Sequence, residues 1–251
     1  MSGHSKWSKI KRKKGANDAK RSKIFGRLIK ELTVAVKEGQ SGDPEFNPRL
    51  RMAIANAKGA NMPKDTIDRA IKKAVDTKND AMYQPTFEGY GPGGVAIFIE
   101  TMTDNNQRTV SNVRAIFNKR GGNLATTGSV GFLFERKGIF VIEPGEHDIE
   151  ELELEFIDAG AEEFEVDEET GEVEVTVDFS DFGNMQKKLE ELGIEPKSAT
   201  LERIPTTTTK LDVDEAKKVL ALIEYLEEDD DVQAVFHNLE MTDEIEAALE
   251  E

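Results

Sequence analysis

Hydrophobic side chains between residues 17 and 78 recur with the 3.6-residue period of amphipathic helices. The first predicted helix begins after Asn17, a suitable N-cap residue, and ends at Gly39, before the loop SGDP. Its apolar side consists of Ile24, Phe25, Leu28, Ile29, Leu32 and Val36. A second helix is predicted from Pro48 to Lys58 and a third after Pro63. This region should therefore fold as a small three-helix domain.

Beyond about Asp80 the pattern changes to alternating strands and helices. Strands are predicted at residues 95–102, 130–135, 139–143, 163–166, 173–177, 199–204 and 232–236. Helices are predicted at residues 107–119, 148–159, 181–192 and 213–226. Residues 139–204 alone have the order β-α-β-β-α-β of a ferredoxin-like unit, and the flanking pieces give β-α-β followed by (β)-α-β.

These patterns predict an α+β protein with an N-terminal basic three-helix domain and two ferredoxin-like α+β domains, one inserted in the other. The basic N-terminal arm and the helical domain occupy residues 1–79. The outer α+β domain combines residues 80–136 with 205–238, and the inserted acidic domain spans 137–204. A short acidic tail, 239–251, follows.

Charge is distributed very unevenly along the 251 residues. Residues 1–78 carry 20 Lys and Arg against 8 Asp and Glu, a net charge of +12, whereas residues 79–251 carry 13 against 42, a net charge of −29. Such asymmetry indicates a polyanionic partner for the basic end, because an evenly acidic protein would repel nucleic acid.

Composition excludes several classes of protein. The chain has no cysteine, which excludes thiol catalysis, iron–sulfur clusters and disulfide-dependent folds. The longest apolar runs fall far short of the roughly 20 residues that span a bilayer, and no apolar stretch follows the basic N-terminus as a signal peptide requires. We expect a soluble, cytoplasmic protein without a membrane partner.

The candidate nucleic-acid-binding residues lie in the first 30 positions. A basic, extended arm is followed by a cationic stripe on the first helix, opposite its apolar side. These residues are Lys6, Trp7, Lys9, Lys11, Arg12, Lys13, Lys14, Lys20, Lys23, Arg27 and Lys30. Such cations neutralise phosphates and release counterions, which gives salt-dependent and mostly sequence-independent affinity. Two roles remain open for Trp7: stacking on a base, or packing the arm onto the helical domain.

Other motifs give little sign of catalysis. Gly89, Gly91 and Gly94 match G-x-G-x-x-G, but a strand follows where a dinucleotide site needs a helix, so a tight turn is predicted. The three histidines lie far apart, and no metal-binding spacing occurs. We expect no catalytic residue, no metal, no cofactor and no small-molecule substrate. An enzyme with a site between the two α+β domains is neither indicated nor excluded.

Asp104, Asn105 and Asn106 precede a predicted helix and suit helix capping. The basic residues of this neutral stretch could extend a nucleic-acid surface or complement the helix dipole. They are Arg108, Arg114, Lys119 and Arg120.

Several long segments together resemble the YebC-like family, bacterial proteins called probable transcriptional regulators and related to mitochondrial translational activators of cytochrome c oxidase. The similar segments are GHSKW (3–7), 17–32, 47–73, EGYGPGGVAIFIE (88–100), 103–124 and FHN (236–238). The acidic stretch from Glu143 to Glu195 is the least similar. The resemblance implies three domains, no catalytic residues and no cofactor. It also implies one of two roles: DNA-binding transcriptional regulation, or a ribosome-associated role that eases translation through proline-rich stretches.

We therefore expect a non-enzymatic, nucleic-acid-binding regulator of gene expression whose partner is double-stranded DNA. The alternative is a translation factor whose basic surface binds ribosomal RNA on the ribosome. In either case, the acidic α+β domains would engage a protein partner or shape specificity.

Overall fold

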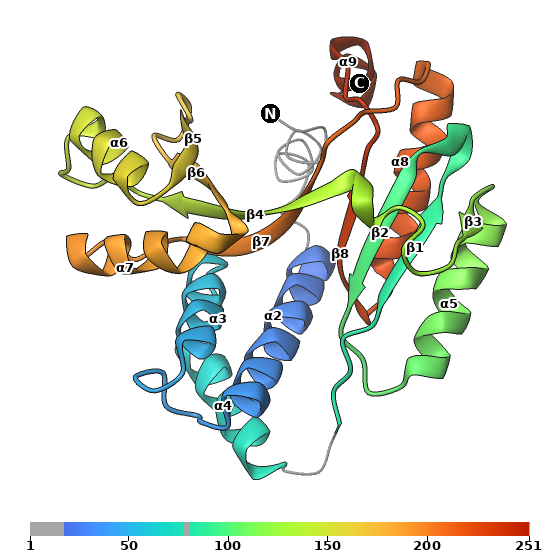
Figure 1. Ribbon diagram of the computed structural model, residues 1–251. Coiled ribbons are helices and arrows are strands. Elements are labelled where there is room, and N and C mark those ends of the chain that lie inside the picture. Colours follow the sequence, from blue (N-terminus) through green and yellow to red (C-terminus); the bar gives the residue numbers. More distant parts are fainter. Residues whose placement is uncertain (1–17, 78–80, 251) are drawn as a thin grey trace. The chain divides into compact units, whose positions relative to one another are not determined.

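The computed structural model describes residues 18–77 and 81–250, and it has the expected α+β fold (Figure 1). Three helices come first: α2 (Asp18–Gly39), α3 (Pro48–Gly59) and α4 (Lys64–Asp76). Asn47 caps α3, since its side chain accepts a hydrogen bond from the backbone N–H of Leu50. Its amide also donates to the carbonyl oxygen of Ala35 on α2, which ties the start of one helix to the end of another.

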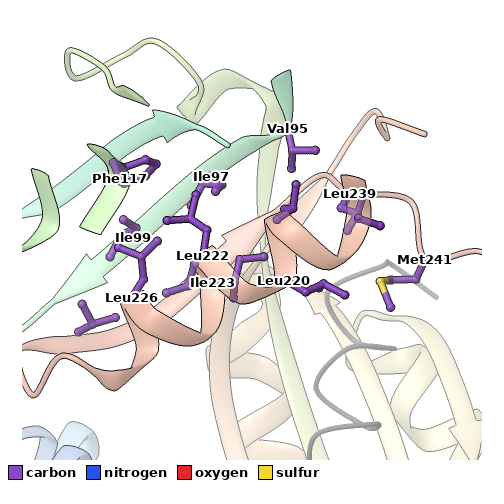
Figure 2. Close-up of a cluster of buried hydrophobic side chains, with 14 of the residues drawn as sticks. Val95, Ile97, Ile99, Phe117, Leu220, Leu222, Ile223, Leu226, Leu239 and Met241 are labelled. Carbon is purple, nitrogen blue, oxygen red and sulfur yellow. The ribbon is translucent and has the colours of Figure 1, made fainter. Parts of the chain in front are cut away.

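The first sheet is antiparallel, with the strand order β3-β1-β2-β8. Its strands are β1 (Thr86–Tyr90), β2 (Ala96–Thr101), β3 (Asn123–Leu124) and β8 (Val232–His237). Helices α5 (Asn106–Lys119) and α8 (Val213–Glu228) pack on one face of this sheet. Figure 2 shows Ile97 and Ile99 of β2 pointing toward Leu222 and Leu226 of α8, with Phe117 of α5 beside them. The alternate residues of β2, Ala96 and Phe98, pack on the other face against the segment 130–134.

The second sheet has the ferredoxin-like order β5-β6-β4-β7. Its strands are β4 (Phe134–Ile142), β5 (Ala161–Val166), β6 (Val173–Asp178) and β7 (Ser198–Pro205). Helices α6 (Ile149–Asp158) and α7 (Phe182–Leu192) cover one of its faces (Figure 1). They pack there through Leu152, Phe156, Met185 and Leu189 onto Phe140, Ile142 and the valines of β6.

The chain divides into two compact units. Among the described residues, the first unit comprises 18–23, 81–135 and 203–250, and the second comprises 24–77 and 136–202. The three-helix segment therefore shares a unit with the second sheet. Strands β4 and β7 each contain one of the points where the chain passes between the units.

Strand β1 was not predicted, and it explains how the first sheet is completed. The bracketed strand of the (β)-α-β order in residues 205–237 does not form, and β1 occupies the corresponding place between β3 and β2. Glycine at position 89 weakens the strand pattern, but packing requires it, because a Cβ there would lie 2.7 Å from the ring of Phe117. The turn predicted from the glycine-rich segment is confirmed: the 3₁₀ turn Pro92–Gly94 joins β1 to β2, and Gly93 has a φ of 67°.

Other expectations from periodicity were wrong. Residues 130–135 do not form one strand, because a 3₁₀ turn (Gly131–Leu133) precedes β4. Ile24, expected on the apolar side of the first helix, is exposed. The segment expected to be an acidic tail contains the helix α9 (Asp243–Glu250), whose Ile245 is buried in the same core as Met241. Its few apolar residues become helical because α8 offers them a surface to cover.

Candidate nucleic-acid interface

The predicted cationic residues are only partly within the described structure. The arm residues Lys6, Trp7, Lys9, Lys11, Arg12, Lys13 and Lys14 lie outside the described residues. The remaining four positions, Lys20, Lys23, Arg27 and Lys30, lie on α2 at spacings of three, four and three. Residues at these spacings are neighbours on a helix surface, so α2 aligns the four positions along one side.

The described side chains of this stripe differ in their surroundings. Lys23 is exposed, and its ammonium donates a hydrogen bond of 2.9 Å to the carbonyl oxygen of Glu228. Glu228 is the last residue of α8, where carbonyl groups lack helical partners and a cation is favoured. Arg27 and Lys30 are half-buried, so their stems contribute to packing as well as charge. The stripe is thus less solvent-exposed than the sequence predicts.

Helix α4 carries a second set of exposed cations. Arg69, Lys72 and Lys73 face solvent, and Lys64 does so at the first position of the helix. The same helix exposes Asp65, Asp68 and Asp76, which offset much of this positive charge. In addition, the Arg69 side chain folds back onto its own helix, where Nε donates to the carbonyl oxygen of Asp65 at 3.0 Å. The surface of α4 is therefore mixed in charge.

A buried polar junction holds α2 and α3 in the second unit. Burial raises the pKa of the Glu31 carboxyl, although a hydrogen bond from Asn56 opposes this effect. The Asn56 amide donates 3.1 Å bonds to Glu31 Oε1 and to the carbonyl oxygen of Ala199 on β7. The helix that bears the cationic stripe is therefore anchored to an α+β sheet through hydrogen bonds rather than only through apolar contacts.

The capping interpretation of residues 104–106 is confirmed. The Asn105 side chain accepts a hydrogen bond from the backbone N–H of Arg108, which identifies Asn105 as the N-cap of α5. The Arg108 guanidinium binds the carboxylates of Asp104 and Asp231, at 2.9 and 2.8 Å. Asp231 Oδ2 is buried and also accepts hydrogen bonds from the hydroxyls of Thr103 and Thr109. Arg108 therefore supports the fold of the first unit.

The other cations of that stretch lie further along α5 and at its C-cap. The guanidinium of Arg120 stacks on the ring of Tyr225, 3.5 Å from its centroid. Arg114 and Lys119 are exposed, and they remain the best placed of this group to contact an anion.

Nothing in the local sequence pattern indicates the role of Glu88. Its carboxylate is 4 % exposed and accepts hydrogen bonds from the backbone N–H groups of Gly128, Val130 and Gly131, at 2.7, 2.6 and 2.8 Å. Burial alone would raise the pKa of Glu88, but the three N–H groups outweigh it and the pKa is lowered. This arrangement holds the loop after β3 against the sheet. A glutamate within an unpredicted strand and a loop some forty residues later carry no joint signal in the sequence.

Within residues 18–77 and 81–250, no three His, Cys, Asp or Glu side chains are grouped so that they could hold a metal ion. No helix in the same ranges is both long enough and apolar enough to cross a membrane.

Two models of known protein families match most of the chain. Residues 5–77 match the family model described as the TACO1/YebC protein N-terminal domain, and residues 82–239 match the TACO1/YebC second and third domain. The chain belongs to the TACO1/YebC family. Among the relatives of this family member is a "probable transcriptional regulatory protein" from Amoebophilus asiaticus, 52 % identical over 95 % of this chain and 98 % of the relative. A relative of the same name from Geobacillus thermodenitrificans is 51 % identical over 96 % and 97 % of the two chains.

The fold of the family member is also similar to that of a solved structure. A crystal structure of a conserved hypothetical protein from Aquifex aeolicus superposes with a TM-score of 0.78 and 42 % sequence identity. The match covers 91 % of this chain and 93 % of the Aquifex chain. The two family models confirm the family expected from the sequence motifs.

Proposed function

We propose that this protein is a non-enzymatic, cytoplasmic regulator of gene expression that binds nucleic acid through its N-terminal arm and the cationic stripe of α2. The observation that carries the proposal is the concentration of 11 basic residues and a single acid, Asp18, in the first 30 positions of a chain with a net charge of −17. The names of the relatives, which denote probable transcriptional regulators, favour double-stranded DNA as the partner.

The proposed contact is made mainly with phosphates. Lys and Arg side chains in the arm would neutralise the backbone, and α2 would present the neighbouring cations from a fixed helix. Lys23 would exchange its bond with the Glu228 carbonyl for a phosphate, because a charge-assisted bond to an anion is the stronger of the two.

Ribosomal RNA is the second candidate partner. The resemblance to mitochondrial translational activators favours it, and phosphate contacts serve RNA as well as DNA. In that case the protein would act on the ribosome as a translation factor.

Crosslinking in cells separates the two candidates. The tagged protein is irradiated with ultraviolet light, and the recovered DNA and RNA are both sequenced. Enrichment at defined promoter duplexes supports transcriptional regulation, whereas crosslinks concentrated on ribosomal RNA support the translation factor.

The test of the contact itself is a variant in which Lys11, Arg12, Lys13 and Lys14 are replaced by Ala. We expect this variant to lose most of its affinity for nucleic acid. The logarithm of its binding constant should also depend less steeply on the logarithm of the salt concentration. The matched control replaces Lys187, Lys210, Lys217 and Lys218, four exposed cations outside the candidate interface, and should retain binding. Full binding by the arm variant would contradict the proposal.

A further inference from the structure

Helix α6 of the second unit has apolar side chains on two sides. Leu152 and Phe156 are buried in the core beneath the second sheet's helices. Leu154 and Ile157 point the other way and are 66 % and 53 % exposed. They are three residues apart, so they are neighbours on the helix surface and form one apolar patch. Single exposed apolar residues are common, but a pair at contact spacing on a short helix is a candidate docking surface.

Carboxylates frame this patch. Leu154 has Glu150, Glu151 and Asp158 as its neighbours one turn away, in addition to Ile157. Asp148, Glu151, Glu155 and Asp158 follow one another at spacings of three, four and three along the same side of the helix. A hollow of about 260 Å³ lies beside them, lined by these carboxylates together with Leu152, Leu154, His147 and Leu192.

The carboxylates around the patch exceed the cations available to them nearby. Lys188 of α7 binds Glu155 Oε2 at 2.7 Å and lies 4.0 Å from Glu191. Residues 137–204 as a whole contain 22 Asp and Glu and only 5 Lys and Arg. This excess of 17 negative charges equals the net charge of the entire chain, so the rest of the chain is neutral overall. Like charges at these helical spacings destabilise a helix, and a cationic partner would relieve the repulsion.

We propose that the outer face of α6, namely Leu154, Ile157 and the surrounding carboxylates, is a docking surface for a cationic amphipathic segment of another protein. Its apolar side chains would cover Leu154 and Ile157, and its Lys or Arg residues would bind Glu150, Glu151 and Asp158. Charge determines the choice of partner: this face repels nucleic acid and anionic lipid and attracts a basic peptide. The surface goes beyond the proposed nucleic-acid contact, since it lies on the acidic part of the chain and needs no cation of the arm.

Binding to the full-length protein is measured with a fluorescent 14-residue peptide of Lys and Leu, whose leucines follow the i, i+3, i+4, i+7 pattern. Two control peptides replace all leucines by Ser or all lysines by Glu. We expect binding of the first peptide only, because both the apolar and the cationic component are needed.

Two variants of the protein locate the site. The first variant, Leu154→Ser with Ile157→Ser, should weaken peptide binding at least tenfold. The second variant, Glu151→Gln with Asp158→Asn, should weaken peptide binding and also reduce the dependence of that binding on salt. All four positions are exposed, so the fold should persist. The matched controls, Val166→Ser and Glu163→Gln with Glu168→Gln, change exposed residues elsewhere in the same domain and should stay within twofold of wild type.

Three results would overturn the proposal. The first is equal binding by the Leu154/Ile157 variant and its controls. The second is at least tenfold tighter peptide binding after replacement of Lys11, Arg12, Lys13 and Lys14 by Ala, which would show that the protein's own arm occupies this face. The third is a dimer in sedimentation that dissociates in the Leu154/Ile157 variant, which would assign the face to a second copy of the chain.

Discussion

Asn56 pairs with the backbone of Ala199 in the way that a neighbouring strand would. Its Nδ2 donates to the Ala199 carbonyl oxygen at 3.1 Å, and its Oδ1 accepts from the Ala199 N–H at 2.8 Å. Helix α3 is thereby hydrogen-bonded to the edge strand β7, across 143 positions of sequence. One side chain thus satisfies two backbone groups that would otherwise be buried without partners.

Replacing Asn56 by Leu should therefore destabilise the second unit by about 2–4 kcal/mol, since it leaves the N–H and the carbonyl of Ala199 unpaired. Hydrogen exchange at the Ala199 amide is the direct measurement, and its protection should fall in the variant. Asn118→Leu, at an exposed position of α5, is the control. Unchanged protection of Ala199 would show that the pairing does not hold the strand.

Gly59 lies where α3 ends against the segment before β7. A Cβ at this position would come within 1.8 Å of the carbonyl oxygen of Lys197, a contact that backbone atoms cannot relieve without a shift. Gly59→Ala should therefore lower the free energy of unfolding by about 1–3 kcal/mol, as overpacking a core does. The unfolding midpoint should fall with it.

Gly183 on α7 provides the matched control for Gly59. Nothing lies within 4 Å of its would-be Cβ, so Gly183→Ala should leave stability unchanged or raise it by about 0.5–1 kcal/mol. Thermal unfolding followed by circular dichroism distinguishes the two substitutions. Equal midpoints would contradict the close approach at Gly59.

Glu31 should make the protein less stable as pH rises from acidic toward neutral values. Because its folded pKa is raised by burial, the folded state holds this proton more tightly than the unfolded chain does. The free energy of unfolding should then decrease as pH rises from the unfolded pKa through the folded one. Glu31→Gln keeps an acceptor for Asn56 and removes the charge, so its midpoint at pH 7 should exceed that of wild type. The difference should vanish at acidic pH, and Glu45→Gln, an exposed control, should show neither effect.

Glu88 should have the opposite effect on the pH dependence of stability, because it stabilises the protein at neutral pH and not at acidic pH. Its folded pKa is lowered, so its contribution to stability is fully present above the unfolded pKa and is lost as pH falls through the folded one. Glu88→Gln puts an amide N–H₂ among three backbone donors, which should cost about 2–4 kcal/mol at pH 7.

The cost of Glu88→Gln should shrink on acidification, because the wild-type carboxyl then gains a proton too. Urea unfolding at several pH values measures this convergence. Glu224→Gln, at an exposed position of α8, is the reference. A penalty independent of pH would show that the loss comes from packing rather than from the charge.

Much of this fold could be predicted from local pattern. The three helices, the β-α-β-β-α-β order of residues 139–204 and the helix at 213–226 follow from periods of 3.6 and 2 that each segment displays by itself. Strand β1 could not be predicted, because Gly89 and the buried Glu88 interrupt its pattern, and both are explained only by Phe117 and by the loop that Glu88 binds. Helix α9 could not be predicted for a similar reason, since its few apolar residues favour a helix only when they pack on the core of the first unit.

For the candidate interface, the sequence alone determined the sign, the position along the chain and the spacing of the charges, because these are properties of residue order. Only the tertiary structure decided which cations remain accessible: Arg108 and Arg120 are engaged by Asp231 and Tyr225, and Lys23 is bonded to Glu228. It also decided that Leu154 and Ile157, which a helical pattern alone could assign to either side, face outward. The physical reason is that hydrogen bonds, ion pairs and burial depend on groups brought together by folding from distant parts of the chain, and a local period contains no information about them.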